Sequence, residues 1–504
     1  MPIWAWLLLL IAGGILLLAV HDLTQRRHTI LRNFPVVGHL RYGLESIGPE
    51  LRQYIVTDND AERPFSRDER RWVYETAGGA GGLAGFGTDN DLDTAAGYLF
   101  VRHAAFPVDP PPAEATAGYP LACAKVLGGP RGRRHAFRPA SAVNISSMSF
   151  GSLGPRAIES LNLGAALAGC WQGTGEGGIS ESHRQGGDLI WQIGTGYFGC
   201  RDAHGRFDLA RLVDTVAGAP VRAIEIKLSQ GAKPGLGGVL PGAKVTPEVA
   251  AMRGIPVGET CHSPARHSAF GDVDSMLDLV ELIAAETGLP VGIKSAVGED
   301  RFWEELAHLM ATTGRGVDHI TIDGGEGGTG AAPLPFADNV ALAFLDGFPR
   351  VYRALAEAGV VDDVVLIGSG RLGLPVRGLT AFALGADAIN TGREAMLSIG
   401  CIQAQRCHTG HCPTGITTSS RWLQRGIDPT RKSVRCASYV EGLRRDLLRL
   451  TRAAGVRHPA LVDPSMIEER AGTGRLVTLG ARNGYEPGWG VPNPAVLREA
   501  GLLD

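Results

Sequence analysis

The chain has 504 residues, of which 44% are hydrophobic and 20% charged, so it is long enough to bury a large core. Its net charge of −3 argues against nucleic-acid binding, which usually requires a basic domain. Its 70 glycines gather in short runs rather than in repeats, which argues against a fibrous chain. Such runs indicate tight turns at which the backbone approaches a ligand.

The N-terminus begins with an apolar run from Ile3 to Val20, which is long enough to cross the hydrocarbon core of a membrane. A cleaved signal peptide is the alternative, but no basic segment precedes the run and no small-residue cleavage site follows it. Arg26, Arg27 and Arg32 follow the run, and positive charge marks the cytoplasmic side of a span. We therefore expect residues 1–28 to form a single-pass membrane anchor, with the N-terminus outside and the catalytic body in the cytoplasm.

The next segment, residues 29–112, is expected to be a small helical region followed by a linker. The stretch from Glu45 to Ile55 predicts a short helix that packs against the body. A proline-rich run at 107–112 is typical of a linker.

Residues 113–450 alternate short apolar runs with helical stretches, which predicts an α/β fold with parallel strands. The candidate strands are 142–147, 221–228, 290–295, 317–323, 363–367 and 386–390, and candidate helices include 274–287 and 338–358. Polar or glycine-rich residues follow nearly every strand. In a closed barrel all these strand ends meet on one face and form the active site, so we expect a (β/α)8 TIM-type barrel rather than an open sheet. Residues 451–504 form a C-terminal extension without a catalytic pattern.

The most specific chemical pattern is a group of three cysteines, Cys401, Cys407 and Cys412, with a proline directly after the third. Closely spaced thiols with a trailing proline are typical of a loop that binds an iron–sulfur cluster. Three cysteines without an evident fourth favour a three-iron cluster, or a four-iron cluster with one open corner. A zinc site that uses the two histidines of the loop, and unligated thiols, are the alternatives. The other five cysteines are scattered, and we expect buried thiols rather than disulfides.

A second pattern consists of two consecutive strand-to-helix loops that could hold a phosphate. Gly368-Ser-Gly-Arg371 follows one apolar run, and Gly385–Arg393 follows the next. Backbone N–H groups and an arginine in two such loops form the phosphate site found late in TIM barrels. One loop alone would be an ordinary turn, but the pair predicts a flavin-phosphate site.

A third pattern is the glycine-rich stretch from Asp323 to Pro333, which would let the backbone pass close to a flat or anionic ligand. Lys294 lies within an apolar strand, and a lysine inside a barrel needs an anionic partner. The N1–O2 edge of a reduced flavin would be such a partner, and a structural carboxylate is the alternative.

Together these residues resemble the flavin-binding synthase domain of glutamate synthases. The matching run covers well over half of the chain, from Ser146-Ser-Met-Ser-Phe-Gly151 to Cys412-Pro-Thr-Gly415. It includes Gly173-Thr-Gly-Glu-Gly-Gly178, Gln230-Gly-Ala-Lys-Pro-Gly-Leu-Gly-Gly238, Pro241-Gly-Ala-Lys-Val-Thr246 and His262-Ser-Pro264. The apolar N-terminus and residues 33–77 are similar to a stand-alone bacterial branch of this family.

The resemblance implies two cofactors, FMN and a three-iron, four-sulfur cluster. The residues expected to contact FMN are Ser147, Met148 and Ser149 against the flavin, Lys294 at its N1–O2 edge, and Ser369, Gly370, Gly392 and Arg393 at its phosphate. Cys401, Cys407 and Cys412 would hold the cluster, which would relay single electrons to FMN.

The resemblance also implies a substrate and partners. Lys233 and Arg253 match the residues expected to grip 2-oxoglutarate, because cationic donors suit carboxylates. Glu176 matches the acidic residue near the position where the imine forms, and reduction of 2-iminoglutarate would give glutamate. The electron donor would be a ferredoxin or an NAD(P)H-linked subunit.

We expect the chain to differ from the full-length enzymes in having no N-terminal cysteine nucleophile, no glutaminase domain and no C-terminal β-helix. We therefore expect nitrogen to come from free ammonia or from a separate glutaminase. Two alternatives stay open. One is a related amino- or imino-acid oxidoreductase, such as a methylglutamate synthase, and the other is a membrane-tethered electron-transfer component.

Overall fold

The computed structural model describes residues 2–25, 27–80, 85–112 and 114–503. The chain forms two compact units, Met1–Asp68 and Glu69–Asp504. Met1, Arg26, which supported the predicted orientation, and residue 113, the predicted start of the barrel domain, lie outside the described residues. Residues 69–80 and 85–112, which the sequence analysis assigned to the helical region and linker before the barrel, group with the barrel in this division.

The first unit consists of helices joined by short turns: α1 (Ile3–Thr24), α2 (Thr29–Asn33) and α3 (Gly38–Leu51), which continues into a wider helical turn at Arg52–Val56. α1 has 22 residues and a mean hydropathy of 2.6, so its length and composition would allow it to cross a membrane. A signal sequence passes the same test. The C-terminal end of α1 is held by Asp22, whose carboxylate accepts a hydrogen bond from the backbone N–H of Val36 at 2.8 Å.

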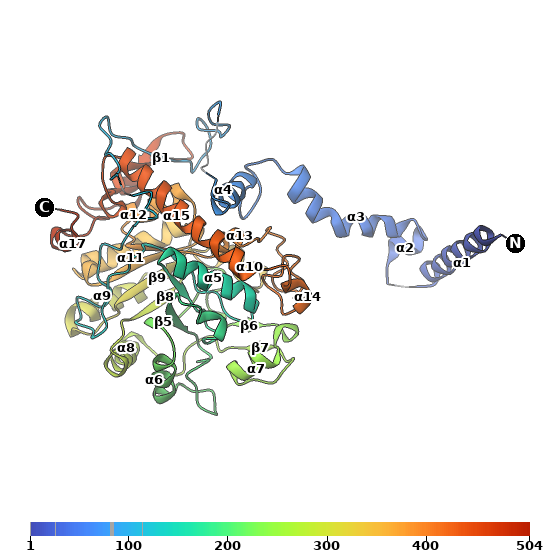
Figure 1. The fold of residues 1–504 in the computed structure, drawn as a ribbon, viewed down its shortest axis with the longest axis horizontal. Coiled ribbons are helices and arrows are strands. Elements are labelled where there is room, and N and C mark those ends of the chain that lie inside the picture. The colour runs from blue at the N-terminus through green and yellow to red at the C-terminus, as the bar shows by residue number, and fades with distance from the viewer. Residues whose placement is uncertain (1, 26, 81–84, 113, 504) are drawn as a thin grey trace. The chain divides into compact units, whose positions relative to one another are not determined.

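The second unit is built around a closed barrel of parallel strands (Figure 1). This barrel confirms the predicted fold class. Around the barrel, each strand pairs with the next in the order β10, β11, β2, β3, β4, β5, β8 and β9. Their bounds are β2 Val143–Ile145, β3 Trp171–Gly173, β4 Asp188–Ile193, β5 Val221–Lys227, β8 Val291–Ser295, β9 His319–Asp323, β10 Val365–Ser369 and β11 Ala388–Thr391. The sequence analysis located all of these except β3 and β4.

The side chains of the barrel strands alternate between the inside and the outside, because successive residues of a strand point to opposite faces. Near the amino ends, the inward residues are apolar and form one cluster of buried side chains: Trp171, Ile190, Ala223, Val365, Ile367 and Ala388, together with Cys123 and Leu127. Two positions further along several strands, the inward residues are polar. The carboxyl ends of the strands therefore carry the groups that can contact a ligand.

Helices follow most of the barrel strands: α5 (Pro155–Ala168), α6 (Leu209–Ala217), α8 (Val273–Thr287), α9 (Arg301–Thr313), α10 (Leu334–Asn339), α11 (Phe344–Glu357), α12 (Pro375–Ala383) and α13 (Arg393–Ser398). The helix predicted over 338–358 is interrupted, so α10 and α11 are separate. The long helix α15 (Pro429–Ala453) packs along α5. Gly164 permits this close approach, since a Cβ there would lie 2.6 Å from the Cβ of Cys436.

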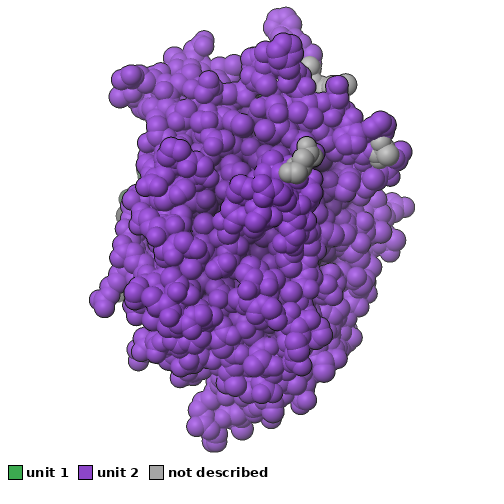
Figure 2. Space-filling model, turned by 90° about the vertical axis from the view of Figure 1, so that its left-hand side faces the viewer, with its two compact units in different colours: residues 1–68 green, residues 69–504 purple. Residues whose placement is uncertain are grey.

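Two additions extend the barrel near its ends. An insertion between β5 and α8 forms a hairpin of β6 (Val239–Leu240) and β7 (Cys261–His262), with α7 (Pro247–Arg253) between them. A small sheet joins β1 (Leu99–Val101) to β12 (Ile467–Arg470) and β13 (Leu476–Thr478), so the predicted C-terminal extension pairs with the segment before the barrel. The remaining helices are α4 (Arg67–Ala77), α14 (Arg421–Gln424), α16 (Leu479–Asn483) and α17 (Pro494–Glu499). The unit of residues 69–504 presents a continuous surface on the face drawn in Figure 2.

Candidate active site

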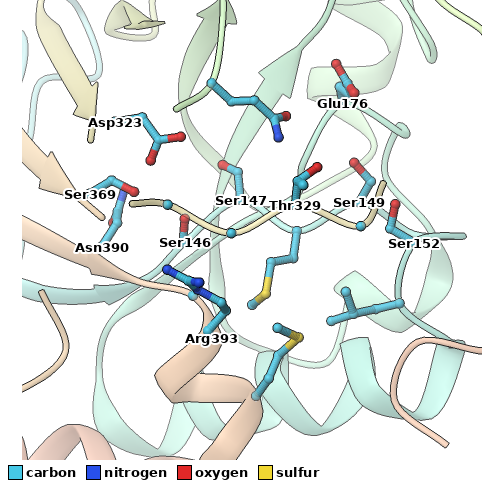
Figure 3. Close-up of a pocket in the computed structure, with 18 of the residues that line it drawn as sticks. Ser146, Ser147, Ser149, Ser152, Glu176, Asp323, Thr329, Ser369, Asn390 and Arg393 are labelled. Carbon is cyan, nitrogen blue, oxygen red and sulfur yellow. The ribbon is translucent and has the colours of Figure 1, made fainter. Parts of the chain in front are cut away.

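A pocket lies at the carboxyl ends of the barrel strands and has an empty volume of about 1140 Å³, part of which is open to solvent (Figure 3). This is the scale of a pocket for a cofactor or a small substrate. Most of the site residues predicted from the sequence line it, namely Ser147, Met148, Ser149, Glu176, Lys233, Lys294, Ser369, Gly370, Gly392, Arg393 and Cys407. Arg253, Cys401 and Cys412 do not.

The floor of the pocket rests on a buried carboxylate in the barrel, Glu225 of β5. It accepts hydrogen bonds from the amide of Gln192 at 2.6 Å, from Thr321 at 2.5 Å and from Ser147 at 3.4 Å. Gln192 and Ser147 also line the pocket, so this carboxylate fixes the orientation of two groups that a ligand would touch.

Lys294 has a carboxylate partner within the pocket. This agrees with the alternative in the sequence analysis, in which a structural carboxylate pairs with this lysine. Its ammonium lies 3.6 Å from Asp323, which also accepts a hydrogen bond from the backbone N–H of Gly231 at 2.9 Å. Burial alone would raise the pKa of Asp323, but Lys294 and the hydrogen bond from Gly231 hold it below its usual range. Because both side chains line the pocket, the pairing with Asp323 does not remove Lys294 from contact with a ligand.

Glu176 stands on the opposite side of the pocket next to two lysines. Its carboxylate lies 3.0 Å from the ammonium of Lys227, which also donates to Gln230 at 2.6 Å. Burial works to raise the pKa of Glu176, but Lys227 and, more weakly, Lys233 and Arg253 lower it overall. Glu176 is therefore a carboxylate that is largely shielded from water and keeps its negative charge at neutral pH.

Arg253 lies at the end of α7, near Glu176 but outside the pocket lining. Its guanidinium donates to the carbonyl of Phe150 at 3.0 Å and lies 4.9 Å from the ring centroid of Phe198. In this position it supports the charge of Glu176 from outside the pocket.

Two glycines of the Gly173–Gly178 run allow this loop to pack directly on residues 147–149. A Cβ at Gly173 would lie 2.2 Å from the hydroxyl of Ser147, and one at Gly175, where φ is +69°, would lie 2.4 Å from the backbone nitrogen of Ser149. The sequence analysis explained such runs by approach to a ligand. Here the two glycines permit contact between two loops, and that contact presents residues 147–149 to the pocket.

At the far side of the pocket, Ser369, Asn390 and Arg393 face the same space (Figure 3). The side-chain oxygen of Asn390 is buried and accepts no hydrogen bond from any residue that the structure describes. Arg393 donates to the carbonyl of Glu326 in the glycine-rich stretch. A buried acceptor without a partner costs free energy, which fits a ligand that brings hydroxyl or N–H donors to this corner.

The three cysteines of the predicted cluster loop lie between α13 and α14 in irregular backbone. As the loop stands, the described residues contain no group of three or more His, Cys, Asp or Glu side chains arranged to hold a metal ion. Burial, and the nearby thiols of Cys407 and Cys412, raise the pKa of Cys401 to about 12. Lys244 attaches the loop to the pocket, since its ammonium donates to the carbonyls of Ser152 at 2.8 Å and Cys407 at 3.0 Å.

The sequence analysis did not assign a role to Lys227, Gln230 or Asp323, all of which line the pocket. Lys227 is the last residue of the apolar strand β5, and Lys294 lies within the apolar strand β8, so the argument that singled out Lys294 applies equally to Lys227. Lys244 was quoted only as part of a matching motif.

A closed parallel barrel with a charged pocket at the carboxyl ends of its strands defines a (β/α)8-barrel enzyme. Residues 132–457 match the family model described as a conserved region in glutamate synthase. The chain belongs to the glutamate synthase family of oxidoreductases.

The relatives cover the chain to different extents. It is similar to the glutamate synthase large subunit-like protein YerD of Bacillus subtilis, with 36% identity over 94% of this chain and 97% of that protein. It is 35% identical to the archaeal glutamate synthase (NADPH) of Methanocaldococcus jannaschii, over 62% of this chain and 59% of that protein. Among solved structures, a sulfite-bound double variant of flavocytochrome b2 gives a TM-score of 0.43 at 14% identity, over 91% of this chain and 90% of that chain. A likeness this distant has no bearing on the family assignment.

Proposed function

We propose that the chain is an FMN and iron–sulfur oxidoreductase that reduces 2-iminoglutarate, formed from 2-oxoglutarate and ammonia, to glutamate. One observation carries the proposal. A single pocket brings together the residues expected to bind flavin, the pair of Glu176 and Lys227, and Cys407 of the cysteine loop. The names of relatives such as the glutamate synthase of Methanocaldococcus jannaschii support the same activity.

FMN fits the donors and acceptors of the pocket. Ser369, Gly370, Gly392 and Arg393 would hold its phosphate, and the unpartnered oxygen of Asn390 would accept from a ribityl hydroxyl. Lys294 would lie at the electron-rich edge of the ring system, with Ser147, Met148 and Ser149 against the ring. When bound, FMN supplies the hydride that reduces the imine carbon.

Lys227 and Lys233 would bind the carboxylates of 2-oxoglutarate. Both line the pocket beside Glu176, whereas Arg253, which the sequence analysis paired with Lys233, is held by Phe150 outside it. A cation close to a carboxylate in a pocket shielded from water binds it strongly. Arg253 would act indirectly, through the charge of Glu176.

Glu176 would act on the nitrogen of the substrate. Because Lys227 keeps the pKa of this carboxyl below its usual range, the side chain is anionic and can accept a proton or a hydrogen bond from ammonia or from the imine nitrogen. An anion beside a protonated imine also stabilises the positive charge of the imine. When its nitrogen is protonated, the imine accepts hydride at carbon more readily.

The three cysteines fit an iron–sulfur cluster by the type and number of their donor atoms. Cys407 lines the flavin pocket, so Cys401, Cys407 and Cys412 would hold the cluster next to the flavin. The electron donor would be a ferredoxin or an NAD(P)H-linked subunit, and a separate glutaminase could supply ammonia. An electron-transfer component alone would not need Lys227, Lys233 and Glu176 in the pocket.

The apolar helix α1 would anchor the protein in a membrane, with residues 29–504 in the cytoplasm. Deletion of residues 1–28 should then give soluble, coloured protein, whereas the full chain should stay with the membrane fraction. A C-terminal reporter that is active only on the outer side of the membrane would contradict this orientation.

The function is tested with purified protein, 2-oxoglutarate, ammonia and a panel of reductants. The protein should be yellow-brown and should release FMN rather than FAD on denaturation. An Arg393→Met variant should lose FMN, whereas Arg350→Met, which removes a half-exposed arginine on α11, should retain it. Release of FAD, or no flavin in the unaltered protein, would contradict the proposal.

A further inference from the structure

The helix α4 precedes the segment that matches the family and lines no part of the pocket. Three of its side chains, Glu69, Trp72 and Tyr74, nevertheless reach structure that supports the proposed cofactor sites. Glu69 and Tyr74 contact two different loops, which are separated along the chain by α12, β11 and α13, whereas Trp72 contacts α15.

Glu69 holds an arginine of the loop between β10 and α12, residues 370–374, which we call the phosphate loop. Both of its carboxylate oxygens accept from the same guanidinium nitrogen of Arg371, at 3.1 and 3.0 Å, and Arg377 lies 3.6 Å away. Arg371 lines the pocket directly after Ser369 and Gly370, and its φ of +53° is unfavourable for a residue with a side chain. The ion pair with Glu69 therefore stabilises a backbone conformation that the isolated loop would disfavour.

Trp72 supports the same loop by a second route. Its ring packs edge-on against Tyr439 of α15, with the ring centroids 6.1 Å apart, and its N–H donates to Asp446 at 3.3 Å. Tyr439 is fully buried and donates to the carbonyl of Gly373 at 2.8 Å. The loop is thus held two residues beyond Arg371 as well.

Tyr74 reaches the cysteine loop. Its hydroxyl donates to the carbonyl of Cys401 at 2.8 Å. Arg435 joins the same region, because it donates to the carbonyls of Ser398 at 2.9 Å and of Tyr74 at 3.3 Å. The backbone at the first cysteine is therefore fixed by a helix outside the barrel.

We infer that α4 is a positioning element that sets the phosphate loop and the cysteine loop relative to one another, through Glu69 and Tyr74. The inference rests on the proposed function, which places FMN and the cluster at these two loops. Loops bind a ligand only as precisely as their supporting contacts hold them. Loss of Glu69 should therefore weaken FMN binding, and loss of the Tyr74 hydroxyl should weaken retention of iron.

The test for the phosphate loop uses the full chain loaded with FMN and measures the flavin fluorescence that appears on dilution. Glu69→Gln should raise the dissociation constant for FMN roughly tenfold, as expected for a lost hydrogen bond to a charged group. Glu75→Gln is the matched control, since Glu75 lies on the same helix with an exposed side chain. In an Arg371→Gln background, Glu69→Gln should have little further effect, because the two residues act as a pair.

The test for the cysteine loop measures iron that remains after exposure to a chelator. Tyr74→Phe should lose iron faster than the unaltered protein while it retains FMN, and Glu75→Gln should not. FMN affinity of Glu69→Gln equal to that of Glu75→Gln, or an unchanged effect of Glu69→Gln in the Arg371→Gln background, would overturn the inference. If the unaltered protein binds no FMN, the proposed function fails instead, so the two failures are distinct.

Discussion

Lys227 and Glu176 form an ion pair of 3.0 Å inside the pocket, where both side chains are largely shielded from water. Although burial works to raise the pKa of Glu176, Lys227 makes the largest contribution that lowers it, and Lys233 adds to the lowering. The pair gives the pocket a cation and an anion next to one another. This is the arrangement that a keto acid and a nitrogen nucleophile would need in order to react there.

The lysines of the pocket should govern the binding of 2-oxoglutarate. Lys227→Met and Lys233→Met should each weaken binding by roughly 2–5 kcal/mol, because one partner of a buried charge pair is lost. Arg253→Met should have a smaller effect on KM and should mainly reduce stability, since its guanidinium holds Phe150 and Phe198. Steady-state kinetics and thermal unfolding of the three variants separate the two kinds of effect. If KM rises strongly for Arg253→Met but not for the two lysine variants, Arg253 rather than the lysines binds 2-oxoglutarate.

Glu176→Gln should retain substrate binding but reduce turnover. The amide keeps the shape of the side chain but has no negative charge to accept a proton or to stabilise a protonated imine. Loss of a proton-transfer group commonly costs about 10²–10⁴-fold in rate. The measurement is kcat and KM at saturating ammonia. A variant with unchanged kcat would remove Glu176 from the chemistry.

Removal of one cysteine of the loop should affect the iron–sulfur cluster but not the binding of FMN. Cys407→Ala should lose iron while it largely retains flavin, and the unaltered protein should contain about three irons per chain. Cys123→Ala is a suitable control, because Cys123 is buried in the core away from the loop. Metal analysis and the flavin absorbance of the same samples decide the outcome. Stoichiometric zinc without iron would contradict the cluster.

His319 should make the protein less stable in acid. It is buried in the barrel without a hydrogen-bond partner among the described residues, and burial lowers its pKa from 6.5 to about 4, although Glu225 lies 3.9 Å away. Between these two pH values the unfolded chain binds a proton that the folded protein does not bind, so stability falls as the pH drops. The contribution of this one residue is about 3 kcal/mol.

Denaturant unfolding at about pH 7 and at about pH 4.5 measures this dependence. His319→Phe, which fills the space without a titrating group, should be less sensitive to acid than the unaltered protein. His308→Asn is the control, since His308 is exposed on α9 and should leave the pH dependence as it was. Equal acid sensitivity of the unaltered protein and of His319→Phe would show that other groups dominate.

The barrel was predictable because its pattern is local. Asp323 ends β9, and Lys294 lies one residue before the end of β8. Both strands are recognisable as apolar runs, and the polar residue at the carboxyl end of each indicates the face on which the site forms. β3 was missed because its three residues, Trp171–Gly173, include no β-branched side chain, and β4 was missed because it follows a glycine pair rather than a clear helix.

The composition of the site was less predictable than its location. The exclusion of Arg253 depends on where α7 and the β6–β7 hairpin place its side chain, which no local pattern specifies. Likewise, the contact of Tyr74 with Cys401 joins residues that are 327 positions apart. Contacts of this kind follow from tertiary packing and leave no periodic signal in the sequence.

The most direct test of the proposed function is a single-turnover experiment on the reduced protein under anaerobic conditions. We expect 2-oxoglutarate together with ammonia to restore the absorbance of oxidised flavin and to yield one glutamate for each flavin reoxidised. Neither 2-oxoglutarate nor ammonia should do so alone. If the reduced flavin is not reoxidised by the two together, whichever donor reduced it, the protein does not make glutamate, and a different imino acid or a role in electron transfer would take its place.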